Sequence, residues 1–551
     1  MVIRDHPWSS VARRLDGASR ADRAARARTT SVNGSDRIGA YTTLAVSGLL
    51  GYFVGSRGFP EWQVPVETAQ VLAGIVRYPP DNPFLIYHLK LWTVLHQICA
   101  AFLAAGVSEI RLSVWLSGIT GMLSFQALAM TTFAFSRSSW ISVATTIVVF
   151  VSGATNYGVR YPIFLLGTSH TYGSVGLSWA VLTAALIGCG RYRVALFLLG
   201  LAPAVHPSLG IWLAIIAALA FASDLPSVRV NVLPNWRWFA GGATLTAVSL
   251  ALHLWTGRGV PAIDSSTAAR FLATFTALWD EHRQPMGLVH VGVALNLAAV
   301  LVGIISLRWI SRSLPPSSSF GLRFVIASGL VSFACIALSW VPPDRLPGFV
   351  VVLMPTRVVN VDVMMFAVLV LGLLGTYRTV AGRLLLAGVM GGLLLTSHRL
   401  PDVLHPQLRT IEVAFRDRTN DALLATAARG KGLLATGGDL HLIQLRTRRP
   451  VVLDGGGLDG LPYALAGGPE MARILRDIYG IDFFNPPAEA HGIGMVPSSF
   501  NRRVWEGYPQ DRWEEIRRKY NVTQVMTYND WTLHLPIVAQ NARYLLYEIP
   551  Q

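Results

Sequence analysis

The chain has 551 residues, of which 52% are hydrophobic and only 14% are charged, and its formal net charge is +15. An average soluble domain carries about 25% charged residues, so this composition disfavours a soluble protein and makes the lipid bilayer an expected partner. The arginines lie beside apolar segments instead of forming one basic stripe. Membrane topology therefore explains the net charge better than nucleic acid does, and no nucleic-acid partner is expected.

Residues 1–37 contain eight arginines and four aspartates among many Ala and Ser residues. This composition predicts a disordered basic arm. The arm has no apolar stretch of its own, and residues 38–56 follow it without a convincing cleavage site. We therefore expect residues 38–56 to be a retained first helix, with the arm in the cytoplasm.

Apolar stretches with few charges match the thickness of a bilayer and predict about eleven transmembrane helices within residues 38–398. The stretches lie near residues 38–56, 112–136, 139–154, 172–189, 193–206, 208–223, 238–256, 287–307, 322–341, 359–376 and 382–396. Residues 89–107 are also apolar, but they contain Lys90 and His96 and follow a proline-rich stretch. Whether they span the membrane decides the orientation of every later helix.

The positive-inside rule resolves this choice. If residues 89–107 lie along the membrane surface, five basic loops all become cytoplasmic. They contain Arg137, Arg191 with Arg193, Arg229 with Arg237, Arg308 with Arg312, and Arg378 with Arg383. The same count places residues 57–111, 155–171, 257–286, 342–358 and everything after His398 on the outer face of a cytoplasmic (inner) membrane. The short pair of segments 193–206 and 208–223 is the weakest part of this count of transmembrane spans.

From about residue 400 the pattern changes to short β-like runs and helical stretches, so residues 399–551 are predicted to form a small outer-face α/β domain. The expected strands are Gly432–Thr436, Arg449–Leu453, Val522–Thr527 and Tyr544–Ile549, and the expected helices are Glu470–Tyr479 and Asp511–Tyr520. The predicted fold is thus an all-α polytopic membrane domain followed by this α/β domain.

Three cysteines and two glycine-rich runs carry no chemistry in this interpretation. Cys99, Cys189 and Cys335 lie far apart in apolar segments, so they indicate neither a disulfide framework nor a metal site. The runs around Gly432 and Gly456 lack the spacing of a phosphate-binding loop and are predicted to be turns. No metal ligand is assigned, and the cofactor stays unknown, with a divalent metal left open.

The long outer loop 57–111 is predicted to hold two helices at the membrane interface, one starting near Pro65 and one beyond Asp81. Its carboxylates Glu61, Glu67 and Asp81 would lie near the membrane surface. Acidic residues favour the first turn of a helix, which is one explanation for Glu67. The other is that Glu67 is a general base that acts on a hydroxyl group.

Two histidines are further candidates. His170 and Tyr172 belong to a polar run that begins at Thr168, at the mouth of a predicted helix, where ordinary helix capping is the alternative explanation. His206 precedes Pro207 in a very apolar region, and ionisable groups within membranes are often functional. A packed, hydrogen-bonded histidine is the alternative there.

Arg345 and Arg357 break the charge bias because they fall in the outer loop 342–358. The planar guanidinium suits phosphate, so these arginines, together with Arg399 after the last helix, could hold a lipid-linked phosphate. Arginines that anchor helix ends are the alternative. The charged residues of the loop 257–286, among them Asp280 and His282, are interpreted mostly as solvated.

The basic arm, first helix, long acidic outer loop, short-looped helices and outer C-terminal domain together resemble the C-type (GT-C) superfamily of membrane glycosyltransferases. Oligosaccharyltransferase and protein O-mannosyltransferase catalytic subunits belong to it. That superfamily usually shows an acidic pair early in the first outer loop, a place that Glu67 takes here. The last stretch, WEEIRRKYNVTQVMTYNDWTLHLPIVAQNARYLLYEI, is similar to the end of uncharacterised bacterial relatives.

The resemblance implies transfer of a sugar, with inversion, from a polyprenyl-phosphate donor to a glycan, lipid or protein on the outer face. Glu67 and His170 would be catalytic. The substrate-binding candidates are Asp81, Tyr172, His206, Arg345, Arg357 and Arg399. The alternatives are a transporter or flippase of a lipid-linked glycan and a non-catalytic membrane scaffold.

Overall fold

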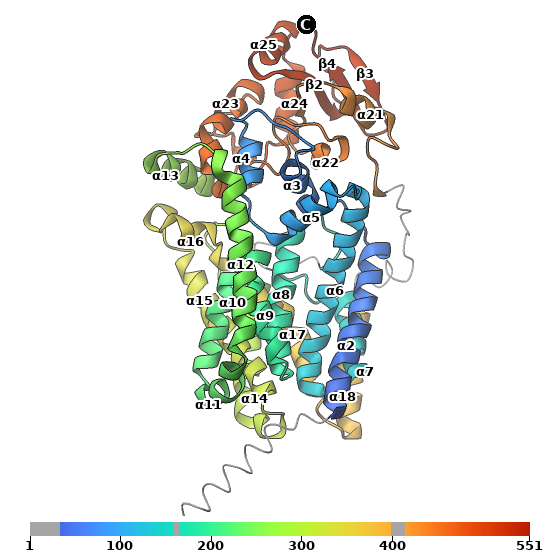
Figure 1. The fold of residues 1–551 in the computed structure, drawn as a ribbon, viewed down its shortest axis with the longest axis vertical. Coiled ribbons are helices and arrows are strands. Elements are labelled where there is room, and N and C mark those ends of the chain that lie inside the picture. The colour runs from blue at the N-terminus through green and yellow to red at the C-terminus, as the bar shows by residue number, and fades with distance from the viewer. Residues whose placement is uncertain (1–33, 159–164, 281, 398–413) are drawn as a thin grey trace, which may run out of the picture.

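The computed structural model describes residues 34–158, 165–280, 282–397 and 414–551. A tall bundle of helices carries a smaller mixed domain on one end (Figure 1). The first bundle helix, α2 (Gly34–Phe53), begins before the predicted start at residue 38. Most of the predicted basic arm, and the expected domain boundary at residue 399, lie outside the described residues.

The described chain is mostly helical. Besides α2, the bundle helices are α6 (Glu109–Ser136), α7 (Ser139–Ser152), α8 (Thr171–Gly188), α9 (Tyr192–Val205), α10 (Pro207–Ala222), α12 (Trp236–Thr256), α14 (Val291–Trp309), α15 (Ser318–Leu338), α17 (Val359–Leu374) and α18 (Val380–Leu395). Within the described residues, six helical stretches are long and apolar enough to cross a membrane. They are Asp36–Gly58, Glu109–Ser136, Leu225–Gly259, Val291–Trp309, Ser318–Leu338 and Gly348–Leu374. The other bundle helices are shorter, so eleven spans stays a prediction.

The apolar segment 89–107 forms α5 (Val94–Ala104), a helix of 11 residues. At 1.5 Å per residue it is about 16 Å long, roughly half of a hydrocarbon core. It lies at the end of the bundle that carries the C-terminal domain (Figure 1). Within this segment, the helix is therefore too short to cross a bilayer core.

The helix ends gather at two opposite ends of the bundle. One end, here called the basic end, carries Arg137 and Arg191. Arg137 Nη2 donates to the Gly188 carbonyl (3.1 Å) and to Ser317 Oγ (3.0 Å). These bonds join the turns after α6 and α8 to the start of α15. Arg191 similarly reaches the Asp36 carbonyl at the start of α2 (3.3 Å). The short elements α11 (Leu225–Ser227), η2 (Val228–Val232), η3 (Leu233–Asn235) and η6 (Ser311–Ser313) also lie between helices there. This grouping of loops agrees with the charge pattern.

The α9 and α10 helices form a tight hairpin that turns at His206. The His206 residue ends α9 and caps α10 with its side chain, and Pro207 occupies the first turn of α10. Gly210 permits the close approach, because a Cβ atom there would lie 2.5 Å from the Pro203 backbone nitrogen. The two predicted segments are therefore separate helices, and His206 stands at their junction.

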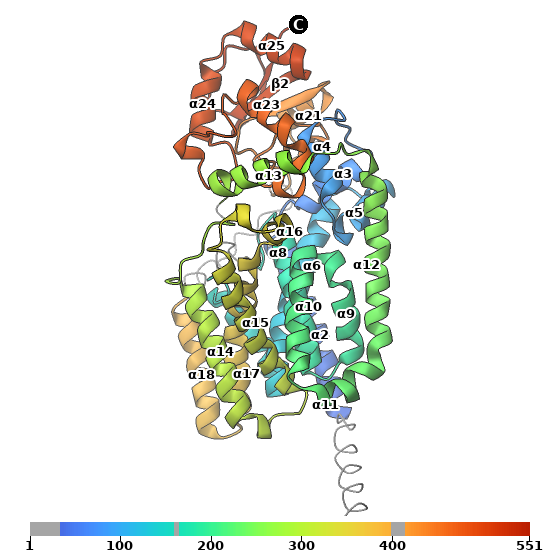
Figure 2. The same cartoon turned by 90° about the vertical axis from the view of Figure 1, so that its left-hand side faces the viewer.

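The opposite end, here called the cap end, carries the C-terminal domain and several short elements. These are η1 (Val54–Gly58), α3 (Val64–Leu72), α4 (Pro83–Lys90), α5, η4 (Gly257–Gly259), α13 (Ser265–Thr274), η5 (Phe275–Trp279), η7 (Pro343–Arg345), α16 (Gly348–Val352) and η8 (Pro355–Val358). Figure 2 shows α3, α4, α13 and α16 between the bundle and the C-terminal domain.

The C-terminal domain is built on a four-stranded sheet in the order β1-β2-β4-β3. The strands are β1 (Leu433–Thr436), β2 (Val522–Tyr528), β3 (Ile537–Gln540) and β4 (Tyr544–Glu548). The pair β1 and β2 is parallel, and the pairs β2–β4 and β4–β3 are antiparallel. The helical elements are α21 (Ala422–Arg429), α22 (Ile443–Thr447), η9 (Leu461–Tyr463), η10 (Leu465–Gly467), α23 (Gly468–Ile478), η11 (Ala488–Ala490), α24 (Ser498–Glu506) and α25 (Gln510–Tyr520).

Three of the four predicted strands and both predicted helices are confirmed as β1, β2, β4, α23 and α25. The prediction of a strand at 449–453 is wrong, because this segment makes a single bridge between Val451 and Leu434. Pro450 offers no N–H group, and the chain turns directly after Leu453. The prediction missed β3, a mostly exposed edge strand whose residues show no apolar alternation.

The helix predicted near Pro65 forms, but its predicted place at the membrane interface is wrong. In α3, every residue from Val64 to Val71 is buried, because the helix lies between the bundle and the C-terminal domain. Gln70 Nε2 donates to the Leu445 carbonyl of α22 (3.1 Å). The α3 helix is therefore an internal element of the protein, with the bundle on one side and the C-terminal domain on the other.

Candidate functional site

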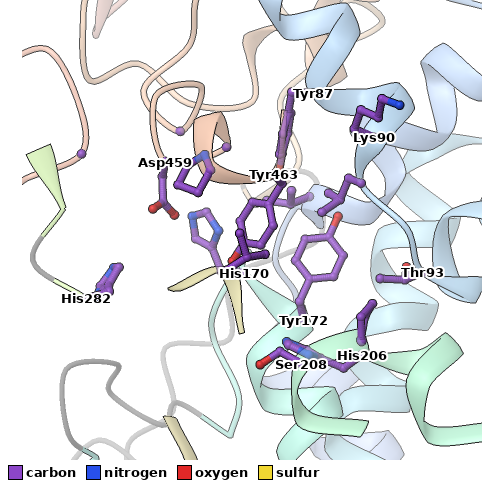
Figure 3. A pocket seen from close by; sticks show the side chains of 18 of the residues that line it. Tyr87, Lys90, Thr93, His170, Tyr172, His206, Ser208, His282, Asp459 and Tyr463 are labelled. Carbon is purple, nitrogen blue, oxygen red and sulfur yellow. The ribbon is translucent and has the colours of Figure 1, made fainter. Parts of the chain in front are cut away.

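A cavity of about 960 Å³ lies where the cap end of the bundle meets the C-terminal domain. Its lining comes from α3, α4, the starts of α8 and α10, the segment from α16 to η8, and C-terminal residues between 441 and 495. Five predicted site residues converge on it, namely Glu67, His170, Tyr172, His206 and Arg357. Figure 3 shows three of them, His170, Tyr172 and His206, together with Asp459 and Tyr463 from the C-terminal domain.

Glu67 lies in the first turn of α3 but is only 2% exposed. Its Oε1 atom has no hydrogen-bond partner among the described residues. Burial raises the pKa of this carboxyl well above its ordinary value, the negative charge of Asp454 raises it further, and a hydrogen bond from the Leu445 backbone opposes the shift. Glu67 therefore does occupy the first turn of a helix, as the alternative explanation expected, but it is buried instead of solvated.

A polar network fixes α3 beneath the cavity. Gln444 of α22 donates through Nε2 to the Glu67 carbonyl (3.0 Å) and to Gln70 Oε1 (3.3 Å). Tyr78 donates its hydroxyl to Gln444 Oε1 (2.5 Å). These bonds reach the backbone of Glu67 and its neighbours, so the network sets the position of Glu67 without engaging its carboxyl group.

His170 precedes α8 and faces His441 of the C-terminal domain, with ring centroids 6.1 Å apart. The ring has free surface, and that surface faces the cavity. Burial lowers the pKa of His170, electrostatic interaction with the nearby His441 ring lowers it further, and Asp459 and Asp454 oppose the shift. His170 is therefore neutral near neutral pH and can accept or donate a proton.

Tyr172 and His206 line the side of the cavity nearer to the bundle (Figure 3). The Tyr172 hydroxyl is hydrogen-bonded to His96 Nε2 of α5 (2.5 Å), so Tyr172 is held from below. His206 Nδ1 accepts the Leu209 N–H group (3.2 Å). Because Nδ1 is an acceptor, the neutral ring carries its proton on Nε2 and can donate.

The backbone before Arg357 has an uncommon conformation. Met354, between α16 and η8, has φ of +46°, in the left-handed region that a side chain disfavours. Ser208 Oγ and Trp212 Nε1 (3.2 Å) of α10 both donate to the Leu353 carbonyl. These contacts hold the turn that directs η8, and with it Arg357, to the cavity.

Arg283 ties this turn to the C-terminal domain. Its guanidinium pairs with Asp280, donates to the Val351 carbonyl (3.1 Å), and donates to the Tyr463 hydroxyl (3.2 Å). Arg283 and Asp280 are both buried, so the pair is a structural connection between three segments. These two residues are exceptions to the interpretation that the charges of the loop 257–286 are mostly solvated.

The sequence prediction missed the residues that the C-terminal domain supplies to the cavity, above all His441, Asp454 and Asp459. Residues 455–457 form the predicted turn, and Gly455 and Gly456 line the cavity. A Cβ atom at Gly455 would lie 2.8 Å from the His441 ring, so this close packing requires glycine. The signal in the sequence was a glycine run with an aspartate on each side.

The cavity is amphiphilic. Charged and polar groups, including Lys90, Arg357 and the three carboxylates Glu67, Asp454 and Asp459, share it with an apolar part. That apolar part includes Ile211 of α10, Leu250 and Leu254 of α12, and Phe349 of α16. These four side chains are 40%, 36%, 62% and 69% exposed, so the apolar lining continues onto the flank of the bundle.

Three predicted site residues are not brought together with the others. Arg345 and Asp81 are exposed and do not line the cavity, because η7 and the start of α4 hold them on the outside of the cap. Arg399 lies outside the described residues. Within the described parts of the chain, no group of three or more His, Cys, Asp or Glu side chains is arranged to hold a metal ion.

Comparison with known proteins returns neither a matching family model nor a matching curated relative.

Proposed function

We propose that this protein is a membrane glycosyltransferase that moves a sugar from a polyprenyl-phosphate donor to an acceptor hydroxyl in the cavity. The resemblance to the GT-C superfamily suggested this reaction. The observation that carries it is the convergence of Glu67, His170 and Arg357 on one amphiphilic cavity. A volume of about 960 Å³ also suits a ligand larger than a single sugar.

The division of the lining matches the two halves of such a donor. The exposed apolar side chains of α10, α12 and α16 suit a hydrocarbon tail that enters from the bilayer. Arg357 and Lys90 suit the anionic phosphate. Asp454 and Asp459 are placed to accept hydrogen bonds from sugar hydroxyls.

In the proposed reaction, Glu67 takes the proton of the acceptor hydroxyl. At the same time, the oxygen of that hydroxyl forms the new bond to the anomeric carbon. The bond from that carbon to the phosphate oxygen breaks, and its electron pair leaves with the polyprenyl phosphate. A single displacement inverts the anomeric centre. A carboxylate whose pKa is raised toward the working pH is a more effective base than an ordinary glutamate. His170 and His206 orient the substrates.

A transporter of a lipid-linked glycan is the main alternative. Transporters bind substrate near the middle of the membrane, between repeats. This cavity lies at the cap end, under a domain that supplies part of its lining. A buried carboxylate with an unpartnered oxygen is also unnecessary for transport or for a scaffold, so both alternatives explain fewer observations.

The test uses the purified full-length protein in nanodiscs. Decaprenyl phosphate should raise its melting temperature and compete with a polyprenyl-phosphate hexose or pentose, whereas a short-chain phosphate should not. In the absence of acceptor, slow release of free sugar from the donor should be lost in Glu67→Gln while donor binding remains. Failure of every polyprenyl phosphate to bind would contradict the proposal, and binding without any turnover would favour transport.

For orientation, we propose eleven spans with the N-terminus in the cytoplasm and residues 399–551 outside. The three native cysteines are buried, so their background labelling should be low. In intact cells, an impermeant thiol reagent should label Ser499→Cys and leave Ser31→Cys unlabelled. The reverse pattern would invert the orientation, and protection of both sites would place the two termini in the cytoplasm.

A further inference from the structure

A polar cluster lies inside the bundle, away from the cavity. Asp362 of α17 and Asn296 of α14 are buried, and Asn296 Nδ2 donates to Asp362 Oδ2 (3.3 Å). Ser328 of α15, next to the Asp362 carboxylate, is fully buried as well. The helices α14, α15 and α17 pack against one another, so three chain segments contribute to the cluster.

The cluster leaves several oxygen atoms unsatisfied. Asp362 Oδ1, Asn296 Oδ1 and the Ser328 hydroxyl have no hydrogen-bond partner that meets the usual geometry among the described residues. Ser328 lies next to the Asp362 carboxylate without forming a well-shaped hydrogen bond. By contrast, the buried hydroxyls of Thr131 and Thr146 each donate to the carbonyl four residues earlier. Buried oxygens without partners are costly unless something else satisfies them.

We propose that Asp362, Asn296 and Ser328 form a binding site for a dehydrated monovalent cation of the size of Na⁺. Carboxylate, amide and hydroxyl oxygens are the ligands that hard cations prefer. A single carboxylate balances one positive charge, whereas a divalent ion would leave a net charge in an apolar bundle. Gly329 brings the α15 backbone close to these oxygens, because a Cβ atom there would lie 3.1 Å from Asp362 Oδ2 and 3.4 Å from Asn296 Oδ1.

The site is close to the candidate donor site along the chain. Arg357 of η8 precedes α17 by two residues, and Asp362 lies in the first turns of that helix. A cation bound by α14, α15 and α17 would hold the start of α17, and therefore η8, in place. Cation binding is a property of the bundle that can be measured without any knowledge of the sugar or acceptor.

The test measures thermal unfolding of the full-length protein in choline chloride, KCl and NaCl at equal ionic strength. Saturating Na⁺ should raise the melting temperature by about 2 °C or more over choline, with a smaller response to K⁺. Asp362→Asn and Ser328→Ala should lose this response. Ser124→Ala, which removes a buried hydroxyl bonded to Ser178, should keep it, and so should Glu67→Gln.

Direct binding of ²²Na⁺ provides the second measurement. The wild-type protein should bind it and release it to unlabelled Na⁺ but not to choline, and Ser328→Ala should bind it more weakly even if Asp362→Asn fails to fold. Equal melting temperatures in all three salts, or a Na⁺ response that survives in Asp362→Asn, would overturn the proposal. A response to pH without a response to Na⁺ would also overturn it, since the carboxyl would then carry a proton.

Discussion

Two buried carboxylates lie close to α3 and have opposite surroundings. Glu109, at the start of α6, accepts hydrogen bonds from Arg448 (2.5 and 3.1 Å) and from Gln70 (3.1 Å), and Arg418 lies 3.7 Å away. The hydrogen bonds from Arg448 and Gln70 occupy both carboxylate oxygens of Glu109. Glu67 lines a cavity, has an unpartnered oxygen, and has a raised pKa.

The carboxyl of Glu109 is used in contacts within the protein, whereas the carboxyl of Glu67 faces a cavity. The Glu109 cluster joins the start of α6 to the C-terminal domain, and its one carboxylate is paired with Arg448 and Arg418, which is typical of a structural ion pair. Glu67 is held through its backbone carbonyl, and its carboxyl is left to the cavity. An uncompensated buried acid that opens into a ligand-sized cavity is typical of a functional site.

The largest expected effect is on Glu67. Replacing it by Gln keeps the volume and removes the base, so glycosyl transfer should fall by about 10²- to 10⁴-fold. The melting temperature should stay equal or rise, because a neutral amide is less costly to bury than a carboxyl. The matched control is Glu61→Gln, which changes a nearby carboxyl that does not line the cavity. Equal loss in both variants would argue against a catalytic role for Glu67.

The two outer arginines should differ as the carboxylates do. Arg357→Ala should weaken transfer by about 10- to 100-fold, mainly as a higher KM for donor, since a charge-assisted contact to phosphate contributes about 1.5 to 3 kcal/mol. Arg345→Ala should change KM by less than about twofold, because Arg345 is exposed and away from the cavity. Steady-state kinetics with varied donor concentration measures both. Similar KM values for the two variants would contradict the proposed phosphate site.

Glu109→Gln should affect stability and leave the chemistry intact. Arg448 is 38% exposed and can regain water, so the expected loss is only about 1 to 2 kcal/mol of unfolding free energy. Thermal unfolding measures this loss, and the folded fraction should retain its specific transfer rate. If Glu109→Gln were as stable as wild type but inactive, the division between a structural and a catalytic carboxylate would fail.

The smallest expected effect is a shift in the pH profile of transfer. Glu67 must be deprotonated to act as a base, so the acid limb of kcat/KM should lie above the ordinary glutamate pKa of about 4.3. Because the charge of Asp454 helps to raise the pKa of Glu67, Asp454→Asn should move this limb to lower pH. An unchanged acid limb in Asp454→Asn would mean that the charge of Asp454 does not raise the pKa of the catalytic base.

Stability gives an independent check on the same pKa. The folded-state pKa of Glu67 is raised above its unfolded value, so its contribution to stability is complete below about pH 4.3 and is lost as the pH rises through the folded pKa. Glu67→Gln should therefore flatten the decline of the melting temperature with rising pH. The same slope in both proteins would indicate that another group causes the decline.

The sequence by itself determined the membrane character, the separate C-terminal pattern and the gathering of basic loops at one end. These properties follow from local composition, since hydropathy, charge placement and residue periodicity need no knowledge of distant contacts. It also determined candidates such as Glu67, His170, His206 and Arg357, because a polar residue in an apolar context is visible locally. It could not separate Arg357 from Arg345, which lie in the same loop with the same charge bias.

The tertiary structure alone decided which candidates meet and what surrounds them. It buried α3, paired Glu109 with an arginine 339 residues away, and brought Asp454 and Asp459 to the cavity from a turn that the sequence left without a role. The physical reason is that the pKa and the reactivity of a carboxyl depend on desolvation and on charges from distant segments. Neither the pKa nor the reactivity of a carboxyl can therefore be read from its position in the sequence, because both depend on the neighbours that the fold brings to it.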